Sequence, residues 1–285
     1  MPDVTLRPLS FGEIVDHGVN LFRRLFVPLV LVQVICTGII VPVQAFLAGS
    51  GRQMSLLYFL MLVASFVLSG LASAAVALII SENYLGRRLE APRALQLALP
   101  KLGAVITLSL AVGVVLVGAA LPALLAMGGA FAFMAPALTG GQVGVNIGLA
   151  VLLFLGGMVL LLLPVFVFSG LALSTPALVL EDLDAGAALR RSWTLTKGSR
   201  LRVVGLVMIS SVIIMIPIIA IGFIGGIFAA GSGSGPATVG STVVTSITTL
   251  ILTPLVYCVL TLLYYDLRVR KEAFDLEVLA SSLSD

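Results

Sequence analysis

Long uncharged stretches alternate with short charged clusters along the whole chain. The clusters occupy the N-terminal segment up to Arg24, residues 82–101, residues 181–202, and Asp266 to the end. Two of the uncharged stretches, Leu102–Leu180 and Val203–Tyr265, contain 79 and 63 residues. A helix needs about 20 apolar residues to cross a bilayer. Each of these two stretches is therefore long enough for a hairpin of two transmembrane helices.

This pattern predicts an all-α fold, a polytopic transmembrane helical bundle that forms a single membrane domain over residues 1–285. We predict six spans, at residues 25–48, 54–81, 103–127, 146–176, 203–229 and 240–265. On the less charged side we expect a tight turn at Gly49–Gln53 and a longer glycine-rich loop at Gly128–Val145. The sequence of Gly231–Val239 is typical of a flexible link.

The composition supports a membrane location. Sixty per cent of the residues are hydrophobic and 10% are charged, whereas about 25% are charged in a typical soluble domain. An even number of spans places both termini on one side, together with 15 of the 16 Lys and Arg residues. The positive-inside rule then predicts that this side is cytoplasmic. Acids are interleaved with the bases in every cluster, so the net charge of +3 does not indicate a nucleic-acid partner.

A short amphipathic helix is predicted before each of three hairpins. Residues 10–25, 90–102 and 184–196 place their apolar side chains at helical spacing on one face. We expect these faces to enter the acyl boundary of the bilayer while the basic faces remain with the headgroups. The helix starts carry recognisable signals, namely a capping box of Ser10 with Glu13, an early Pro92, and Asp184 as N-cap.

The shared layout predicts three repeats, each an interfacial helix followed by a hairpin. The repeat units cover residues 8–84, 88–178 and 183–267, and an amphipathic tail follows at 268–285. Three hairpins can pack around a pseudo-threefold axis or as an asymmetric bundle, and the sequence leaves both arrangements open.

Basic and aromatic residues beside the spans form a candidate surface for membrane lipid or for a partner protein. Basic residues at a bilayer surface contribute about 1 kcal/mol each toward anionic lipid. The alternative is that they only set the topology. The predicted surface comprises Arg23, Arg24, Arg190, Arg191, Trp193, Lys197, Arg200, Arg202, Arg268 and Arg270.

A polar stripe lies within the second predicted span. Ser65, Ser69 and Ser73 recur at every fourth residue and therefore share one helix face. Small residues on such a face are typical of close helix packing. The functional alternative is a polar groove for a lipid headgroup or a small solute.

No set of side chains indicates catalysis. The only histidine, His17, lies on the polar face of the first amphipathic helix. A metal site would need three or more converging ligands, and no spacing demands this. Cys36 and Cys258 lie in apolar stretches and are expected to be core residues. We predict no catalytic residue, no cofactor and no metal.

Three segments, Leu6–Phe26, Pro176–Leu206 and Leu262–Glu277, together resemble a bacterial family. Its motifs here are an Arg-Arg-Ser-Trp helix after a Glu-bearing turn and a Tyr-Asp-Leu-Arg end to the last span. The family is the membrane-domain family named for glycerophosphoryl diester phosphodiesterases, and the likeness covers essentially the whole chain. In some members this region is fused to a phosphodiesterase barrel, whose His- and Glu-based metal site a single histidine cannot supply. The resemblance implies a fold and a bacterial inner-membrane location rather than an activity.

Three functions compete. The leading hypothesis is a non-enzymatic membrane protein whose cytoplasmic amphipathic helices organise lipid or a partner protein. The second is a transporter or flippase for an uncharged or amphiphilic solute. The third is a membrane-embedded lipid enzyme, which would require Glu181 and Asp182 to converge with Asp266 or Glu13 around a cavity or metal.

Overall fold

The prediction of an all-α helical bundle is confirmed. The computed structural model describes residues 9–49, 56–84, 87, 89–138, 147–232 and 234–272, and this part of the chain contains helices and no strand. The helices in chain order are α1 (Phe11–Arg24), α2 (Phe26–Thr37), α3 (Ile40–Gly49), α4 (Leu56–Tyr84), α5 (Ala91–Ala98), the 3₁₀ turn η1 (Leu99–Lys101), α6 (Leu102–Leu138), α7 (Ile147–Leu160), α8 (Leu162–Leu171), α9 (Ser174–Leu180), α10 (Ala185–Thr196), α11 (Arg200–Ser232) and α12 (Ser234–Glu272).

Five helical segments among the described residues are long and apolar enough to cross a membrane. They are Leu56–Asn83, Ala91–Met134, Ile147–Leu180, Arg200–Ile224 and Thr242–Glu272. The count rises to six if α1 and α2, which meet at an 80° bend, are taken as one broken span. The first predicted span, 25–48, is divided between α2 and α3.

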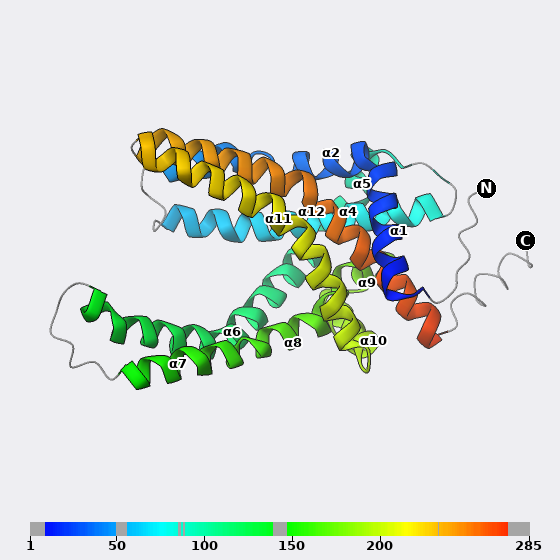
Figure 1. Ribbon diagram of the computed structural model, residues 1–285. Coiled ribbons are helices and arrows are strands. Elements are labelled where there is room, and N and C mark those ends of the chain that lie inside the picture. The colour runs from blue at the N-terminus through cyan, green and yellow to red at the C-terminus, as the bar shows by residue number, and fades with distance from the viewer. Residues whose placement is uncertain are drawn as a thin grey trace, which may run out of the picture.

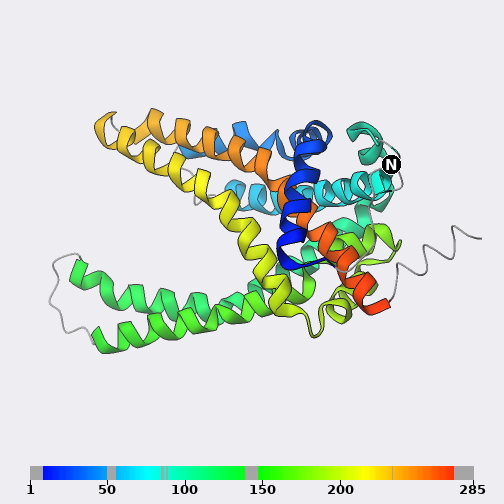
Figure 2. The ribbon, with the colours of Figure 1, turned by 45° about the vertical axis from the view of Figure 1, so that its right-hand side comes forward.

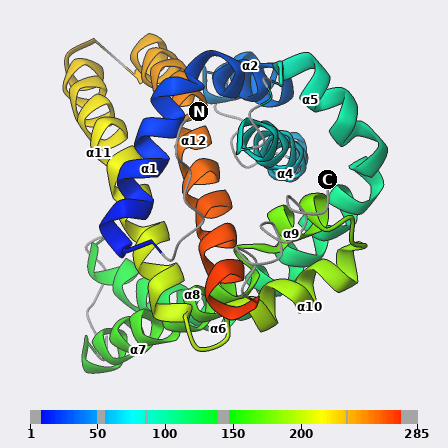
Figure 3. The same cartoon turned by 90° about the vertical axis from the view of Figure 1, so that its right-hand side faces the viewer.

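The helices form two arms that meet at one end of the molecule (Figure 1). The first arm contains α2, α3, α4, α11 and α12, with α12 packed against the other four. The second arm is the hairpin of α6 with α7 and α8, which diverges from the first arm (Figures 1 and 2). We call the junction the collar, made of α1, α5, α9 and α10. These helices lie around the ends of α4 and α12 when the junction is viewed end-on (Figure 3).

Prolines lie in the first turn of several short helices into which the apolar runs are divided, whereas Pro217 and Pro254 lie inside unbroken helices. A proline lacks the backbone N–H that a helix interior needs, but the first turn of a helix has no use for that donor. Several short helices accordingly begin two residues before a proline. These prolines are Pro28 in α2, Pro42 in α3, Pro164 in α8 and Pro176 in α9.

Tertiary contacts extend the helices into two predicted loops. The loop predicted at Gly128–Val145 is wrong as far as Leu138, where the chain is helical, and residues 139–145 lie outside the described residues. Contacts with α7 support this extension, since Ala130 is buried and Phe131 packs edge-to-face on Phe154 with ring centroids 6.4 Å apart.

The predicted link at Gly231–Val239 is wrong in the same sense. α11 continues to Ser232 and α12 begins at Ser234, and the two helices pack along each other. The amphipathic tail predicted at 268–285 lies outside the described residues from position 273 onward.

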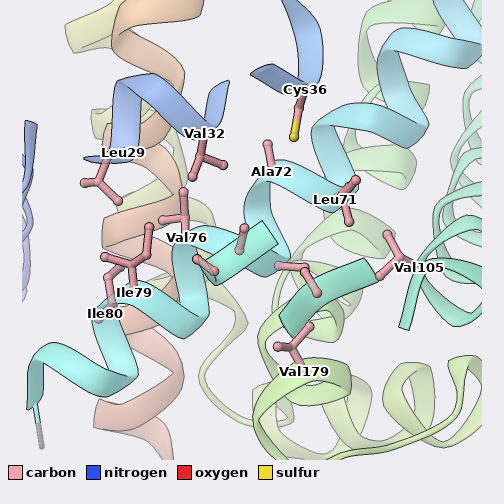
Figure 4. Close-up of a cluster of buried hydrophobic side chains, with 14 of the residues drawn as sticks. Leu29, Val32, Cys36, Leu71, Ala72, Val76, Ile79, Ile80, Val105 and Val179 are labelled. Carbon is pink, nitrogen blue, oxygen red and sulfur yellow. The ribbon is translucent and has the colours of Figure 1, made fainter. Parts of the chain in front are cut away.

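The main core lies where α2, α4, α5, α6 and α9 meet (Figure 4). Leu29 and Val32 of α2 point toward Val76 and Ile79 of α4, and Val105 comes from α6. All five side chains are nearly inaccessible. Lipid tails are as apolar as these side chains, so the core is stabilised by van der Waals packing between helices. This packing ties the start of the second arm to the first.

The apolar faces of the collar helices are covered by protein, not by lipid as the amphipathic pattern suggested. Ile14 of α1 is fully buried. α1 approaches α12 so closely that a Cβ on Gly18 would lie 2.7 Å from a Val259 methyl carbon. Ala94 of α5 is buried beside α4, and Ala188 of α10 is buried beside α9. The ends of the neighbouring helices are apolar, and the apolar faces of the collar helices pack against them.

Each predicted repeat unit does contain a short helix followed by a hairpin, but the hairpins are packed differently. α12 contacts α2, α3 and α4 of the first unit, whereas α7 of the second unit packs against α6 and α8. The arrangement is therefore the asymmetric bundle of the two alternatives. That the three units are repeats of one sequence stays a prediction.

Candidate functional site

The collar holds a dense cluster of ion pairs centred on Arg191. Arg191 on α10 donates from Nε and Nη2 to Glu181 at 2.8–2.9 Å. It also donates to Glu272 at the end of α12, with Nη2 2.7 Å from Oε2. Tyr264 donates its hydroxyl to Glu181, and Arg268 lies 3.2 Å from Glu272. One guanidinium therefore joins the turn after α9, α10 and α12.

Both acid and base in this cluster are held in their charged forms. Burial alone would raise the pKa of Glu181, but hydrogen bonds from Arg191 and Tyr264 hold that pKa below its ordinary value. Hydrogen bonds to Glu272 and Glu181 raise the pKa of Arg191 further above its ordinary value. Such charge-assisted, forked pairs are stronger than neutral hydrogen bonds, so the cluster holds these three elements together. We call an ion-pair cluster that connects separate elements a joint.

A second cluster surrounds the carboxylate of Asp266, whose side chain has no exposed surface. Arg202 at the start of α11 lies 3.0 Å from this carboxylate, and Arg270 lies at 3.0 Å one turn further along α12. The backbone N–H of Leu9 donates to the same group at 2.8 Å. Both guanidinium groups also donate to the carbonyl of Leu9. This joint ties the segment before α1 to α11 and α12.

A third joint fixes the turn that follows α9. Lys101 donates to the carbonyl of Val179 at 2.9 Å and pairs with Asp182 at 2.7 Å. The hydrogen bond from Lys101 also lowers the pKa of Asp182. Asp182 has a φ of 54°, a left-handed conformation that Asp adopts more readily than most residues. Lys101 thereby links the start of α6 to the end of the second hairpin.

Trp193 belongs to an aromatic cluster at the junction of α8, α10 and α11. The guanidinium of Arg200 lies 4.0 Å from the Trp193 ring centroid and 4.1 Å from that of Phe166. Gly170 approaches the indole so closely that a Cβ there would lie 2.3 Å from a ring carbon. Ser192, fully buried beside it, donates to the carbonyl of Gly170 at 2.7 Å.

We expect Gly170→Ala to destabilise the protein by about 1–3 kcal/mol, because the added methyl overlaps the Trp193 ring. Gly156→Ala is the matched control, since nothing lies within 4 Å of a Cβ at that helical glycine. The control should be neutral or stabilising by up to about 1 kcal/mol. Thermal unfolding in detergent, followed by fluorescence of the single tryptophan, measures both. Equal midpoints for the two variants would contradict the close contact.

The structure divides the ten predicted surface residues into two groups. Arg191, Arg202, Arg268 and Arg270 are engaged in ion pairs, and Arg200 stacks with Trp193. The others are exposed and form no ion pair within the described ranges. These are Arg23 and Arg24 at the end of α1, Arg190 of α10, and Lys197 directly after α10. Part of the predicted surface therefore stabilises contacts within the protein.

The serine stripe of α4 lies at helix contacts. The hydroxyls of Ser69 and Tyr257 are 2.8 Å apart and link α4 to α12. Next to it, a Cβ on Gly70 would lie 2.4 Å from the Ser109 hydroxyl of α6. Ser65 and Ser73 are partly buried on the same helix. The Ser69 contact is of the kind that the packing interpretation expects, while the roles of Ser65 and Ser73 stay a prediction.

Between the arms lies an apolar groove with a volume of about 480 Å³. We call it the inter-arm groove. Its walls come from α6, α8 and α11, including Val117, Phe168 and Val207, and every lining residue is apolar. A surface of this kind at membrane depth suits hydrocarbon chains rather than a polar solute.

The carboxylates required by the lipid-enzyme hypothesis do not converge. Glu181, Asp182 and Asp266 each pair with a different basic residue. Glu13 accepts from the backbone N–H of Ser10 in the predicted capping box. Among the described residues no group of three His, Cys, Asp or Glu side chains could hold a metal ion. The sequence pointed to these acids, but not to Tyr264 and Glu272 as their neighbours.

The fold and the membrane-spanning helices define the class: this is an α-helical integral membrane protein. Residues 14–267 match the family model described as a domain of unknown function (DUF7847), and the chain belongs to that family. The match covers the second and third predicted repeat units and the first unit from Ile14 onward. Leu9, Arg268, Arg270 and Glu272 of the ion-pair clusters lie outside it. No curated protein and no solved structure gives a significant match.

Proposed function

We propose that this protein is a non-enzymatic membrane protein that organises lipid around its collar. The observation that carries the proposal is the separation of the basic residues into paired and unpaired groups. Arg23, Arg24, Arg190 and Lys197 are exposed and form no ion pair in the described part of the chain. Unpaired basic side chains at the end of a membrane bundle attract anionic headgroups. The inter-arm groove supplies apolar surface for the chains of the same lipids.

We further propose that the collar faces the cytoplasm of a bacterial inner membrane. All Lys and Arg residues except Arg52 belong to the collar side of the predicted topology, which the positive-inside rule assigns to the cytoplasm. The resemblance to the membrane-domain family named for glycerophosphoryl diester phosphodiesterases supports the bacterial location and remains part of this proposal. A protein partner bound at the collar stays the alternative to lipid.

Neutralising three unpaired basic residues tests the proposal. The triple variant Arg23→Gln, Arg190→Gln, Lys197→Gln should lower the retained anionic lipid at least about fivefold, because each basic residue contributes about 1 kcal/mol. Native mass spectrometry of gently extracted protein, with lipid identification, measures this. The charge-retaining variant Arg23→Lys, Arg190→Lys is the control and should keep the lipid. An unchanged amount of retained anionic lipid in the triple variant would contradict the proposal.

A flippase for an amphiphilic solute is the second candidate. The observation that favours it is the divergence of the two arms, which leaves the inter-arm groove open at membrane depth. The serine stripe no longer argues for it, because Ser69 is engaged with Tyr257. Transfer of a fluorescent phospholipid between leaflets of proteoliposomes, absent in protein-free vesicles, would establish this alternative in place of a static lipid-binding role.

A further inference from the structure

A second groove, of about 610 Å³, lies at the 80° bend between α1 and α2. We call it the elbow groove. Its walls come from the start of α2, the last turns of α4 and the beginning of α5, and these three helices contact one another. The bend places the groove where the amphipathic α1 meets the apolar α2, and we infer from this change in polarity that the groove lies near the boundary of headgroups and acyl chains.

Three polar side chains line the elbow groove. They are Arg24 from the end of α1, Asn83 from α4 and Glu90 from the residue that caps α5. None of the three has a hydrogen bond or ion pair with another described residue, and Glu90 does not use its carboxylate to cap α5. By contrast, Glu181, Asp266 and Glu272 are all paired with arginine side chains. A cation, an anion and an amide therefore share one groove with no internal partner.

The remaining wall of the elbow groove is apolar and leads along α2. Val27 and Leu31 line the groove while keeping 73% and 42% of their surface exposed. Ile79 of α4 lies beneath them and is buried. Exposed aliphatic side chains one turn apart on a membrane helix offer a track for an acyl chain, and they begin next to Arg24.

We propose that the elbow groove binds a zwitterionic aminophospholipid. The phosphate accepts from the guanidinium of Arg24, the primary ammonium donates to the carboxylate of Glu90, and one acyl chain lies along Val27 and Leu31. The net charge of the Arg24 and Glu90 pair is zero, which matches a headgroup with one phosphate and one ammonium. A headgroup with a phosphate but no amine would bring its negative charge beside Glu90 without compensation. The inference rests on the proposed lipid role and names one lipid class for it.

Titration of the delipidated full chain with defined lipids, read by native mass spectrometry, tests the inference. The probes are phosphatidylethanolamine, phosphatidylglycerol and phosphatidylcholine. Wild-type protein should prefer phosphatidylethanolamine over both others. Phosphatidylcholine carries a quaternary ammonium that cannot donate a hydrogen bond to Glu90. Comparing it with phosphatidylethanolamine therefore tests this hydrogen bond on the wild-type protein.

Matched variants locate the binding at the elbow groove. Arg24→Gln should weaken phosphatidylethanolamine binding roughly tenfold, as expected for the loss of a charge-assisted hydrogen bond. Arg93→Gln is the control, because Arg93 is an exposed arginine of α5 that does not line the groove. Glu90→Gln should remove the preference over phosphatidylglycerol, whereas Asp16→Asn, an exposed acid of α1 outside the groove, should not. Leu31→Trp should fill the apolar track and weaken binding of every lipid tested.

Equal effects of Arg24→Gln and Arg93→Gln would overturn the inference, as would equal wild-type binding of the three lipids. A preference for phosphatidylglycerol would also overturn it and would leave only the anionic lipid of the proposed function. The two proposals fail separately. If the Arg23, Arg190 and Lys197 variant keeps its anionic lipid while Arg24→Gln loses phosphatidylethanolamine, the broader lipid-organising role falls and the elbow site stands.

Discussion

Asp266→Asn should lower the free energy of unfolding by about 3 kcal/mol, the largest loss that a single substitution in the collar is expected to cause. The carboxylate of Asp266 has no exposed surface and neutralises Arg202 and Arg270. Its removal leaves two guanidinium groups close together without their acid. Breaking a buried pair by removing one partner is costly because the remaining charge is not compensated.

Thermal unfolding in detergent measures the effect of Asp266→Asn. A loss of about 3 kcal/mol corresponds to a midpoint lower by roughly 6–12 °C. Asp16→Asn is the control, because Asp16 is exposed on α1, and its midpoint should not change. Hydrogen exchange at the Leu9 amide adds a local reading, since this N–H donates to Asp266. An unchanged midpoint together with unchanged exchange would show that the Asp266 ion pairs do not contribute to the free energy of unfolding.

Arg191→Gln is expected to have the next largest effect, a loss of about 2–3 kcal/mol. The substitution removes the guanidinium that donates hydrogen bonds to both Glu181 and Glu272. The two partly buried carboxylates then share only Arg268, which lies 3.7 Å from Glu181 and 3.2 Å from Glu272. Arg191→Lys should recover only part of the loss, because an ammonium retains the charge but not the planar fork that binds two oxygens of one carboxylate.

A double-mutant cycle separates pairing from general damage. If Arg191 and Glu181 stabilise each other, Glu181→Gln combined with Arg191→Gln should destabilise less than the sum of the single substitutions. Additive losses in thermal unfolding would contradict the coupling. The cycle isolates the bond between α10 and the turn after α9, because Glu272 keeps Arg268 as a partner in every variant.

The pH dependence of stability should also report the contribution of the ionised Glu181. The folded protein holds the pKa of Glu181 below its ordinary value, which is about 4.3 in an unfolded chain. A lowered folded pKa means that this contribution is present above the unfolded pKa and is lost as the pH falls through the folded pKa. The midpoint of wild-type protein should therefore fall more steeply below about pH 4.3 than that of Glu181→Gln. Parallel curves for the two proteins would contradict this role of Glu181.

Local patterns in the sequence were enough to predict much of the fold. Ser10 with Glu13 and Asp184 do cap α1 and α10, because capping involves residues only three positions apart. The positions of the transmembrane helices follow from the length of the apolar runs, since lipid forces every backbone group in a span to be paired within its helix. The amphipathic faces of the collar helices were also visible in the spacing of their apolar residues.

Contacts between distant residues were not predictable in this way. The covering of the α1 apolar face by α12 depends on Gly18 and Val259, which lie far apart in sequence. The extension of α6 to Leu138 depends on packing against α7, and propensity at Gly128 and Gly129 argues for a loop.

The pairing of the charged residues was also not predictable from local patterns. Their composition and position determined the membrane class, the predicted topology and the collar as the polar end of the molecule. Only the tertiary structure determined that Arg191 pairs with Glu181 and that Arg202 pairs with Asp266. It also determined that Arg24 and Glu90 lie in one groove without a partner among the described residues. A charge pattern records only the sign and number of the charges, whereas pairing depends on which side chains the packed helices bring within about 3 Å of each other.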